Sequence, residues 1–208
     1  MLAEITTGVV TRGDGAVGGA RGTRLGALVT ASGQGVFTEA AVRARMFDLV
    51  TPVAGVAPGT VLSTTPPLTL WNPPSSGTLV AVLKSYLGYI SGTLGGGSVV
   101  YAVVQAQMTA PSTTGTELVP QCTLVGAPRG VARGFTGSTL VAVPTLLRPA
   151  FVLSAMAAST AVAPDPALDL VDGEIVLPPG TCLCLQGVAA AGTTPLMLLS
   201  LVYEELPL

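Results

Sequence analysis

The sequence predicts an all-β protein, an antiparallel β-sandwich or jelly roll that follows an extended, glycine-rich N-terminal arm. From residue 52 onward, short segments with alternating apolar side chains are separated by turns rich in Pro, Gly, Ser and Thr. About eight to ten strands spaced in this way are typical of sandwiches and jelly rolls. Charged residues make up 10% of the chain, against about 25% in an average globular protein, and apolar residues make up 49%. A chain this poor in charge is typical of an oligomer or a larger assembly.

The first part of the chain, residues 1–41, holds many glycines and few long apolar runs. Glycine at this density increases the entropy lost on folding, so we expect an extended arm or a set of loops that a partner holds in place. Five arginines in or just after this segment are our candidates for partner contacts: Arg12, Arg21, Arg24, Arg43 and Arg45. We divide the chain into residues 1–50, the arm with a lead-in strand, and residues 51–208, the β-domain.

Residues 37–50 allow two interpretations. Their Ala, Arg, Met and Leu content favours a helix, which Thr38 could cap. The alternation of Val42, Ala44 and Met46 with arginines favours a strand instead. We favour the strand, because no other segment has a helical composition.

Prolines and glycines mark the ends of the predicted strands in the β-domain. Trp71 ends one strand before a Pro-Pro-Ser-Ser-Gly turn, and Pro120 places its strand at a sheet edge or a bulge. Loops are expected at residues 127–135 and 144–149. We expect strands at residues 60–63, 68–71, 78–87, 98–108, 117–125, 138–143 and 150–156.

The C-terminal residues form the closing unit of the predicted fold. Strands at 174–177 and 181–186 flank a Pro-Pro-Gly turn, which forms a corner and whose glycine can supply a positive φ. A strand at 196–204 follows, and we expect it to form a hairpin with the strand at 181–186. The last strand is apolar on both faces, so we expect its own core to cover one face and another subunit or layer to cover the other. We assign the oligomer interface to the row Met197, Leu199, Leu201 and Tyr203.

The chain has three cysteines and no histidine, which limits its possible chemistry. Cys182 and Cys184 share one face of a predicted strand, where a direct disulfide is geometrically awkward. Cys122 is the third thiol, and together they lack the ligands of a zinc site. We expect three reduced thiols in a reducing compartment and no metal.

The acidic residues give no catalytic or calcium-binding pattern. Without histidine, general acid or base chemistry would fall to carboxylates or to Lys84. Asp165, Asp169 and Asp172 lie close in sequence, but they lack a partner at catalytic spacing and the Gly and terminal Glu of a calcium loop. We therefore expect neither an enzyme nor a cofactor.

Three further classes of function are disfavoured by the sequence. The glycine-rich segment follows no buried strand and opens no periodic helix, so it does not resemble a phosphate-binding loop. No uninterrupted apolar stretch of about 18 to 20 residues predicts a transmembrane helix. The N-terminus lacks the basic and apolar regions of a secretion signal. We expect no nucleic-acid or membrane partner.

Charges are distributed unevenly along the chain. Residues 1–148 hold all nine cations and five anions, and 9 − 5 gives +4; residues 149–208 hold no cation and six anions, giving −6. Such asymmetry indicates that one end of the molecule meets an acidic partner surface, or that the arm of one copy meets the C-terminal part of another. Unrelated, solvated charges would produce the same distribution.

Two stretches carry more specific information: residues 72–97 read NPPSSGTLVAVLKSYLGYISGTLGGG, and residues 172–208 read DGEIVLPPGTCLCLQGVAAAGTTPLMLLSLVYEELPL. They resemble jelly-roll proteins that decorate or cement the heads of tailed bacteriophages, in which an N-P-x-G-S-G string lies beside a strand and P-P-G-T, G-T-T-P and E-E recur near the C-terminus. Pro74 and Ser75 depart from the first pattern, and Tyr203 stands where a Trp is expected. The resemblance implies a trimeric or otherwise oligomeric β-domain that binds major capsid subunits, without catalysis or cofactor.

From these observations we expect a non-enzymatic virion protein at the capsid surface, made in the host cytoplasm. It would bind the major capsid protein and stabilise the shell as a homotrimer. The alternatives are a phage tail or adaptor protein, a head-fibre component, or a carbohydrate-binding β-sandwich. The last would need several exposed aromatic side chains, for which Trp71, Tyr86, Tyr89 and Tyr101 are the candidates.

Overall fold

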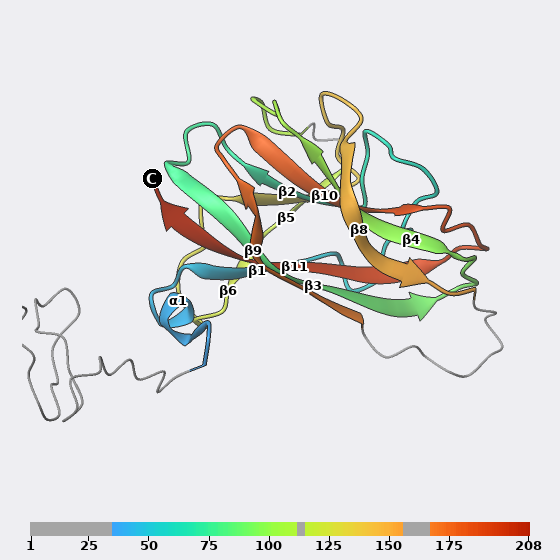
Figure 1. Cartoon of the computed structure of the whole chain (residues 1–208), viewed down its shortest axis with the longest axis horizontal. Coiled ribbons are helices and arrows are strands. Elements are labelled where there is room, and N and C mark those ends of the chain that lie inside the picture. Colours follow the sequence, from blue (N-terminus) through green and yellow to red (C-terminus); the bar gives the residue numbers. More distant parts are fainter. Residues whose placement is uncertain (1–34, 112–114, 156–166) are drawn as a thin grey trace, which may run out of the picture. The chain divides into compact units, whose positions relative to one another are not determined.

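The computed structural model describes residues 35–111, 115–155 and 167–208 (Figure 1). The chain divides into two compact units, Met1–Glu39 and Ala40–Leu208, and every described strand belongs to the second. The predicted arm lies outside the described residues as far as residue 34. Because the second unit begins at Ala40, it includes the lead-in strand that the division at residue 50 placed with the arm.

A short helix and then a strand open the described chain. Helix α1 spans Thr38–Val42 and strand β1 spans Met46–Val50, so the prediction of one strand over residues 37–50 is wrong in its first half. The helix ends in a Schellman-type turn, in which the amides of Ala44 and Arg45 bond back to helix carbonyls, both at 3.0 Å, and Ala44 has a φ of 54°. This turn separates the helix-forming residues from those that alternate across the sheet.

The described strands form two antiparallel sheets. The five-stranded sheet has the order β6-β1-β11-β3-β9, and the six-stranded sheet has the order β5-β7-β2-β10-β4-β8. Besides β1, the strands are β2 (Leu68–Asn72), β3 (Thr78–Ser91), β4 (Gly97–Val104), β5 (Thr116–Leu118), β6 (Gln121–Cys122), β7 (Arg133–Thr136), β8 (Thr145–Leu153), β9 (Ala167–Leu177), β10 (Thr181–Val188) and β11 (Leu196–Pro207).

The strand pairing is that of a jelly roll. Strand β1 pairs with β11, β2 with β10, β3 with β9, and β4 with β8, all antiparallel. The chain is therefore folded back on itself as a long double strand, and successive pairs fall in alternate sheets. Eight strands nested in this way in two sheets constitute a jelly roll. The predicted all-β jelly-roll sandwich is confirmed.

Strands β5, β6 and β7 form an insertion between β4 and β8 that extends both sheets. Strand β6 pairs with β1, whereas β7 pairs with β2 and β5 pairs with β7. The single strand predicted over residues 117–125 is thus divided at Pro120, and its two parts are edge strands of different sheets. Residues 133–136, predicted to lie in a loop, form β7. Pro120 lies between these two strands, where no sheet hydrogen bond requires its missing amide, and both flanking strands are at sheet edges as predicted.

Two predicted strands are loops. Residues 60–63 and 138–143 contain no strand. The Ala189 amide donates to the Thr60 carbonyl and the Leu140 amide to the Thr64 carbonyl, each at 2.8 Å, so these segments make single bonds rather than a ladder. Of their apolar residues, Leu140 packs against the six-stranded sheet, whereas Val61, Val141 and Val143 are exposed.

Three other differences concern edges and connections. Strand β8 includes Pro149, inside the predicted 144–149 loop, because β8 is an edge strand and tolerates the missing amide. The predicted hairpin of residues 181–186 with 196–204 is wrong, because β10 and β11 belong to different sheets. The corner predicted at 178–180 is confirmed: it leads from β9 to β10 in the other sheet, and Gly180 has the anticipated positive φ, 82°.

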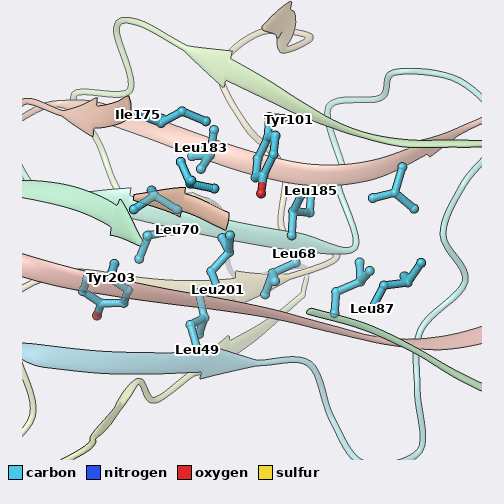
Figure 2. Packing of buried hydrophobic residues seen from close by; sticks show 14 of the residues in the cluster. Leu49, Leu68, Leu70, Leu87, Tyr101, Ile175, Leu183, Leu185, Leu201 and Tyr203 are labelled. Atoms are coloured by element: carbon cyan, nitrogen blue, oxygen red, sulfur yellow. The ribbon is translucent and has the colours of Figure 1, made fainter. Parts of the chain in front are cut away.

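The main core lies between the two sheets (Figure 2). Leu68 and Leu70 of β2 face inward beside Leu183 and Leu185 of β10, and all four are fully buried. Burying one such side chain stabilises the fold by about 1.5–3 kcal/mol. The inner face of the five-stranded sheet contributes Leu49, Val80, Val82, Met197, Leu199, Leu201 and Tyr203.

A smaller cluster lies on the outer face of the six-stranded sheet and comprises Trp71, Val104, Phe135, Leu140, Cys182 and Cys184. Loops cover it, and the buried Gln107 holds them in place. The Trp71 indole N–H donates to the Gln107 carbonyl at 2.7 Å, and the Gln107 side-chain oxygen accepts from the Val141 amide at 3.1 Å. This sheet therefore has apolar cover on both faces within one chain.

Candidate functional site

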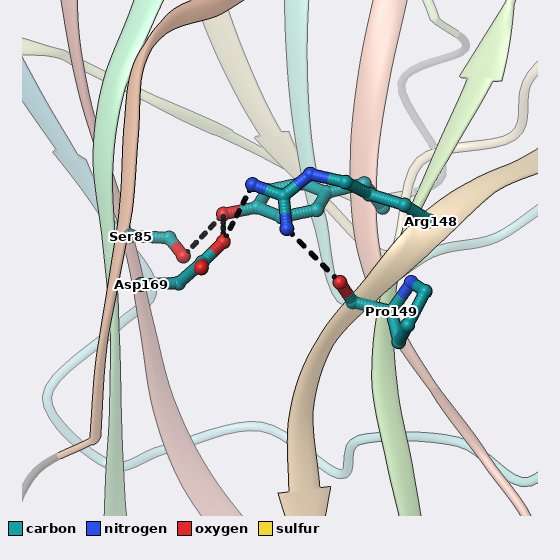
Figure 3. Close-up of polar contacts among 5 residues, drawn as sticks. Ser85, Arg148, Pro149 and Asp169 are labelled. Atoms are coloured by element: carbon teal, nitrogen blue, oxygen red, sulfur yellow. Dashed lines mark hydrogen bonds and ion pairs between the residues drawn. The ribbon is translucent and has the colours of Figure 1, made fainter.

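Four side chains link the two sheets along the side of the sandwich where β8 and β9 are edge strands (Figure 3). The Tyr101 hydroxyl, from β4, lies 2.6 Å from the Ser85 hydroxyl of β3 and donates to Asp169 Oδ2 of β9 at 2.8 Å. The same Asp169 oxygen accepts from Arg148 Nη2 of β8 at 2.9 Å. The Arg148 guanidinium also lies 4.7 Å from the centre of the Tyr101 ring. These contacts hold β3 and β9 against β4 and β8.

Protonation in this cluster favours a structural role. Burial raises the pKa of the Tyr101 phenol above its ordinary value, and Asp169 raises it further, so the phenol stays neutral and donates a hydrogen bond to the carboxylate. Asp169 is occupied by two donors, and Ser85 is fully buried. The cluster thus resembles a clamp between sheets more than a set of reacting groups.

A pocket of about 440 Å³ lies on the same side, where β8 begins and β9 ends. Its lining is mainly aliphatic, with Gln105, Glu174 and Thr181 as polar members; the others are Val103, Val104, Leu147, Ile175, Val176, Leu177, Pro178 and Cys182. A volume of about 300–1,000 Å³ and an apolar lining with a few polar groups are typical of binding pockets. This pocket is the candidate functional site of the described residues.

The predicted contact arginines are only partly described. Arg12, Arg21 and Arg24 lie outside the described residues. Arg43 is exposed and Arg45 is half-buried, in the turn that joins α1 to β1. Their assignment to partner contacts stays a prediction.

The row assigned to the oligomer interface lies in the protein's own core. Met197, Leu199, Leu201 and Tyr203 are all buried between the sheets, so they are unavailable to another subunit and this assignment is wrong. The opposite row of β11 lies on the outer face of its sheet, where Ser200 and Val202 are nevertheless buried. There Leu198 is half-buried, and the Ser200 hydroxyl donates to Asp48 Oδ1 at 2.6 Å. Alternation separated the two rows correctly but gave no sign of which one faces the core.

Sequence reasoning missed one buried carboxylate, that of Glu205 on β11. Its Oε1 accepts hydrogen bonds from the Val131 and Ala132 amides, both at 2.8 Å, and its exposed fraction is 7%. The contact ties the β5–β7 insertion to the last strand. Its only signal in the sequence is that Glu205 continues the inward row through Tyr203.

The remaining candidate residues serve packing. The three cysteines are free thiols; Cys182 and Cys184 are buried, and burial raises the pKa of the Cys184 thiol well above its ordinary value. Trp71 and Tyr101 are buried, so of the four aromatic candidates for a carbohydrate site only Tyr86 is exposed. The described residues contain no group of three histidine, cysteine or acidic side chains placed to hold a metal ion.

Comparison of the chain with protein-family models, with curated proteins and with solved structures found no match. Among the described residues no helix reaches the length and apolarity that a membrane span requires. The functional argument therefore rests on the fold and on the surfaces that it presents.

Proposed function

We propose that the protein is a non-enzymatic virion component, a decoration or cement protein that binds the shell of major capsid protein as a homo-oligomer, most simply a trimer. The observation that carries this proposal is the corner where the two phage-like stretches meet. The Gly180 amide donates to the Asn72 carbonyl at 2.8 Å, and the Asn72 side-chain amide donates to the Thr78 and Leu177 carbonyls at 2.8 and 2.9 Å.

This corner gives the resemblance a physical basis. Asn72 is fully buried, and its side chain joins the end of β2 to the start of β3 and the end of β9. The strings around Asn72 and Gly180 are therefore one structural device in a jelly roll, not two independent turns. Jelly rolls are common among viral capsid domains, which supports the proposal.

The surface also supports a protein that assembles. Exposed apolar side chains remain on the outer face of the five-stranded sheet and at the β8/β9 side, among them Tyr86, Leu168, Leu170 and Val176. A chain with 10% charged residues and such patches is suited to association with other protein surfaces. A protein that binds only the assembled shell stabilises it by the free energy of each binding event.

A carbohydrate-binding role is not favoured by the geometry. Such sites present stacked aromatic side chains at the surface, whereas Trp71 lies under loops and Tyr101 lies in the link between the sheets. Tyr86 alone does not form a platform.

The proposal is tested by adding the purified chain to phage shells that lack it. We expect saturable binding, measured by co-sedimentation, and a higher temperature of shell disruption in the presence of the chain. Shells that have not yet expanded and shells assembled from an unrelated capsid protein are the controls. Equal binding to all shells, or none, would refute a specific cement function.

A further inference from the structure

We propose that the β8/β9 side of one copy binds the N-terminal segment of a second copy, with residues 21–30 as the bound stretch. This inference concerns contacts between copies and does not depend on the virion role. Its experiments use the protein alone, so their failure is distinguishable from failure of the proposed function.

The first observation is an apolar surface around the pocket at the junction of β8 and β9. Leu146 and Leu147 at the start of β8 are 54% and 48% exposed, and Val176 near the end of β9 is 43% exposed. Leu147 and Val176 both line the 440 Å³ pocket. Within the described residues, this is an aliphatic surface beside a pocket with space for aliphatic side chains.

The second observation is a free sheet edge. Strand β9 pairs with β3 on one side, and it ends its sheet on the other, which leaves backbone amides and carbonyls for an added strand. Strand β8 is less suited to such pairing because Pro149 lacks an amide. An extended peptide would therefore add to β9, with side chains reaching the pocket.

The third observation is charge. Neither the Asp172 nor the Glu174 carboxylate makes a hydrogen bond or an ion pair among the described residues, and Glu174 lines the pocket. Arg148, the nearest cation along β8, is already paired with Asp169. The pocket side therefore favours an apolar peptide with a cation close to its apolar residues.

One segment of this chain matches that description. Residues 21–30 read RGTRLGALVT, in which Arg21 and Arg24 precede the apolar residues Leu25, Leu28 and Val29. From residue 30 to the start of α1 at Thr38, an extended chain spans at most about 26 Å at roughly 3.3 Å per residue, which is the upper limit of the reach of this segment.

We assign the bound segment to a second copy of the chain, because this arrangement also accounts for assembly. The chain has few charges, and all its cations precede residue 149, whereas the β8/β9 side carries, besides the paired Arg148 and Asp169, the acids Asp172 and Glu174. Exchange of the segment between copies brings these opposite charges together and buries the aliphatic surface. Repeated around a symmetry axis, the exchange closes a ring of subunits.

Disulfide trapping tests the contact. Full-length Leu28→Cys and Val176→Cys chains, which carry different affinity tags, are co-expressed and oxidised. In the control, Val152→Cys replaces Val176→Cys, because Val152 lies at the other end of β8 and is 84% exposed. We expect a disulfide-linked heterodimer with Val176→Cys and at least about fivefold less with Val152→Cys. Absence of the heterodimer, or equal yields with Val176→Cys and Val152→Cys, overturns the proposal. Any link to the half-buried native Cys122 is identified by mass spectrometry and subtracted.

Charge exchange tests the ion pair in the same contact. Arg24→Glu and Glu174→Lys should each weaken oligomer formation about fivefold in light scattering, in a salt-sensitive way, and should leave the far-ultraviolet circular dichroism unchanged. The two substitutions combined in one chain should restore the oligomer, because the charges are then reversed together. Loss in the single variants without recovery in the double variant contradicts the pairing of these residues.

Discussion

Replacing Tyr101 with Phe removes a single hydroxyl group from the link between the sheets. The ring is fully buried, and Phe retains its packing and its contact with the Arg148 guanidinium. What is lost is the pair of hydrogen bonds, 2.6 Å to Ser85 and 2.8 Å to Asp169. The substitution therefore isolates the contribution of the hydroxyl.

The expected loss of stability follows from what each partner keeps. Asp169 is still bonded to Arg148, but the fully buried Ser85 hydroxyl is left without its partner. A buried polar group left unpaired costs about 1–3 kcal/mol, so Tyr101→Phe should destabilise the protein by about that amount. Tyr101→Phe combined with Ser85→Ala removes both polar groups and should cost less than the sum of the two single changes.

Urea unfolding, followed by circular dichroism, measures this double-mutant cycle. We expect a lower midpoint with an unchanged slope for Tyr101→Phe. Tyr86→Phe is the matched control, because Tyr86 is exposed on β3, the strand of Ser85, and makes no hydrogen bond among the described residues. If Tyr101→Phe is as stable as Tyr86→Phe, or if the two changes at Tyr101 and Ser85 are additive, the clamp does not contribute as argued.

Three further predictions concern single positions. Burial raises the pKa of the Asp48 carboxyl above its ordinary 3.8, so ionised Asp48 opposes folding. Asp48→Asn should therefore be more stable than the wild type near neutral pH, and this advantage should vanish below about pH 3.8. Urea unfolding at several pH values measures the difference in stability. Leu199→Asp should abolish folding rather than release folded subunits, whereas the Leu198→Asp protein, with its substitution on the outer row, should stay folded. Circular dichroism with light scattering distinguishes these results. A folded, monomeric Leu199→Asp protein would contradict the assignment of Leu199 to the core. Gly180→Ala should lower stability by about 1–3 kcal/mol, because φ is 82° and the added Cβ would lie 2.7 Å from the Met108 sulfur. Gly88→Ala is the control and should be tolerated, because its added Cβ would lie 3.6 Å from the nearest atom, in Leu198. Thermal melts compare the two variants.

Much of the fold could be predicted because it depends on local chemistry. Pro178, Pro179 and Gly180 favour a corner through their own backbone preferences. Alternating apolar residues identified most of β3, β4, β10 and β11. The failures in local structure have local causes as well. The helix at Thr38–Val42 is short and needs its C-terminal turn, while Pro149 is compatible with a strand only because that strand lies at an edge.

Neither the pocket nor the link between the sheets could be predicted, because both are made by long-range pairing. Tyr101 and Asp169 are 68 residues apart, and neither has a neighbour in the sequence that announces the contact. Strand β11 is apolar on both faces, so only its place between β1 and β3 determines that Leu199 faces inward. In the same way, the sheet to which a strand belongs follows from the jelly-roll winding and not from the strand's own residues.

A density map of phage particles purified from cells that produce this chain, obtained by cryo-electron microscopy, tests the central claim most directly. The proposal predicts jelly-roll density on the outer surface of the shell, in groups of three copies in contact with major capsid subunits. Jelly-roll density confined to the tail, or a particle from which the chain is absent, would contradict it.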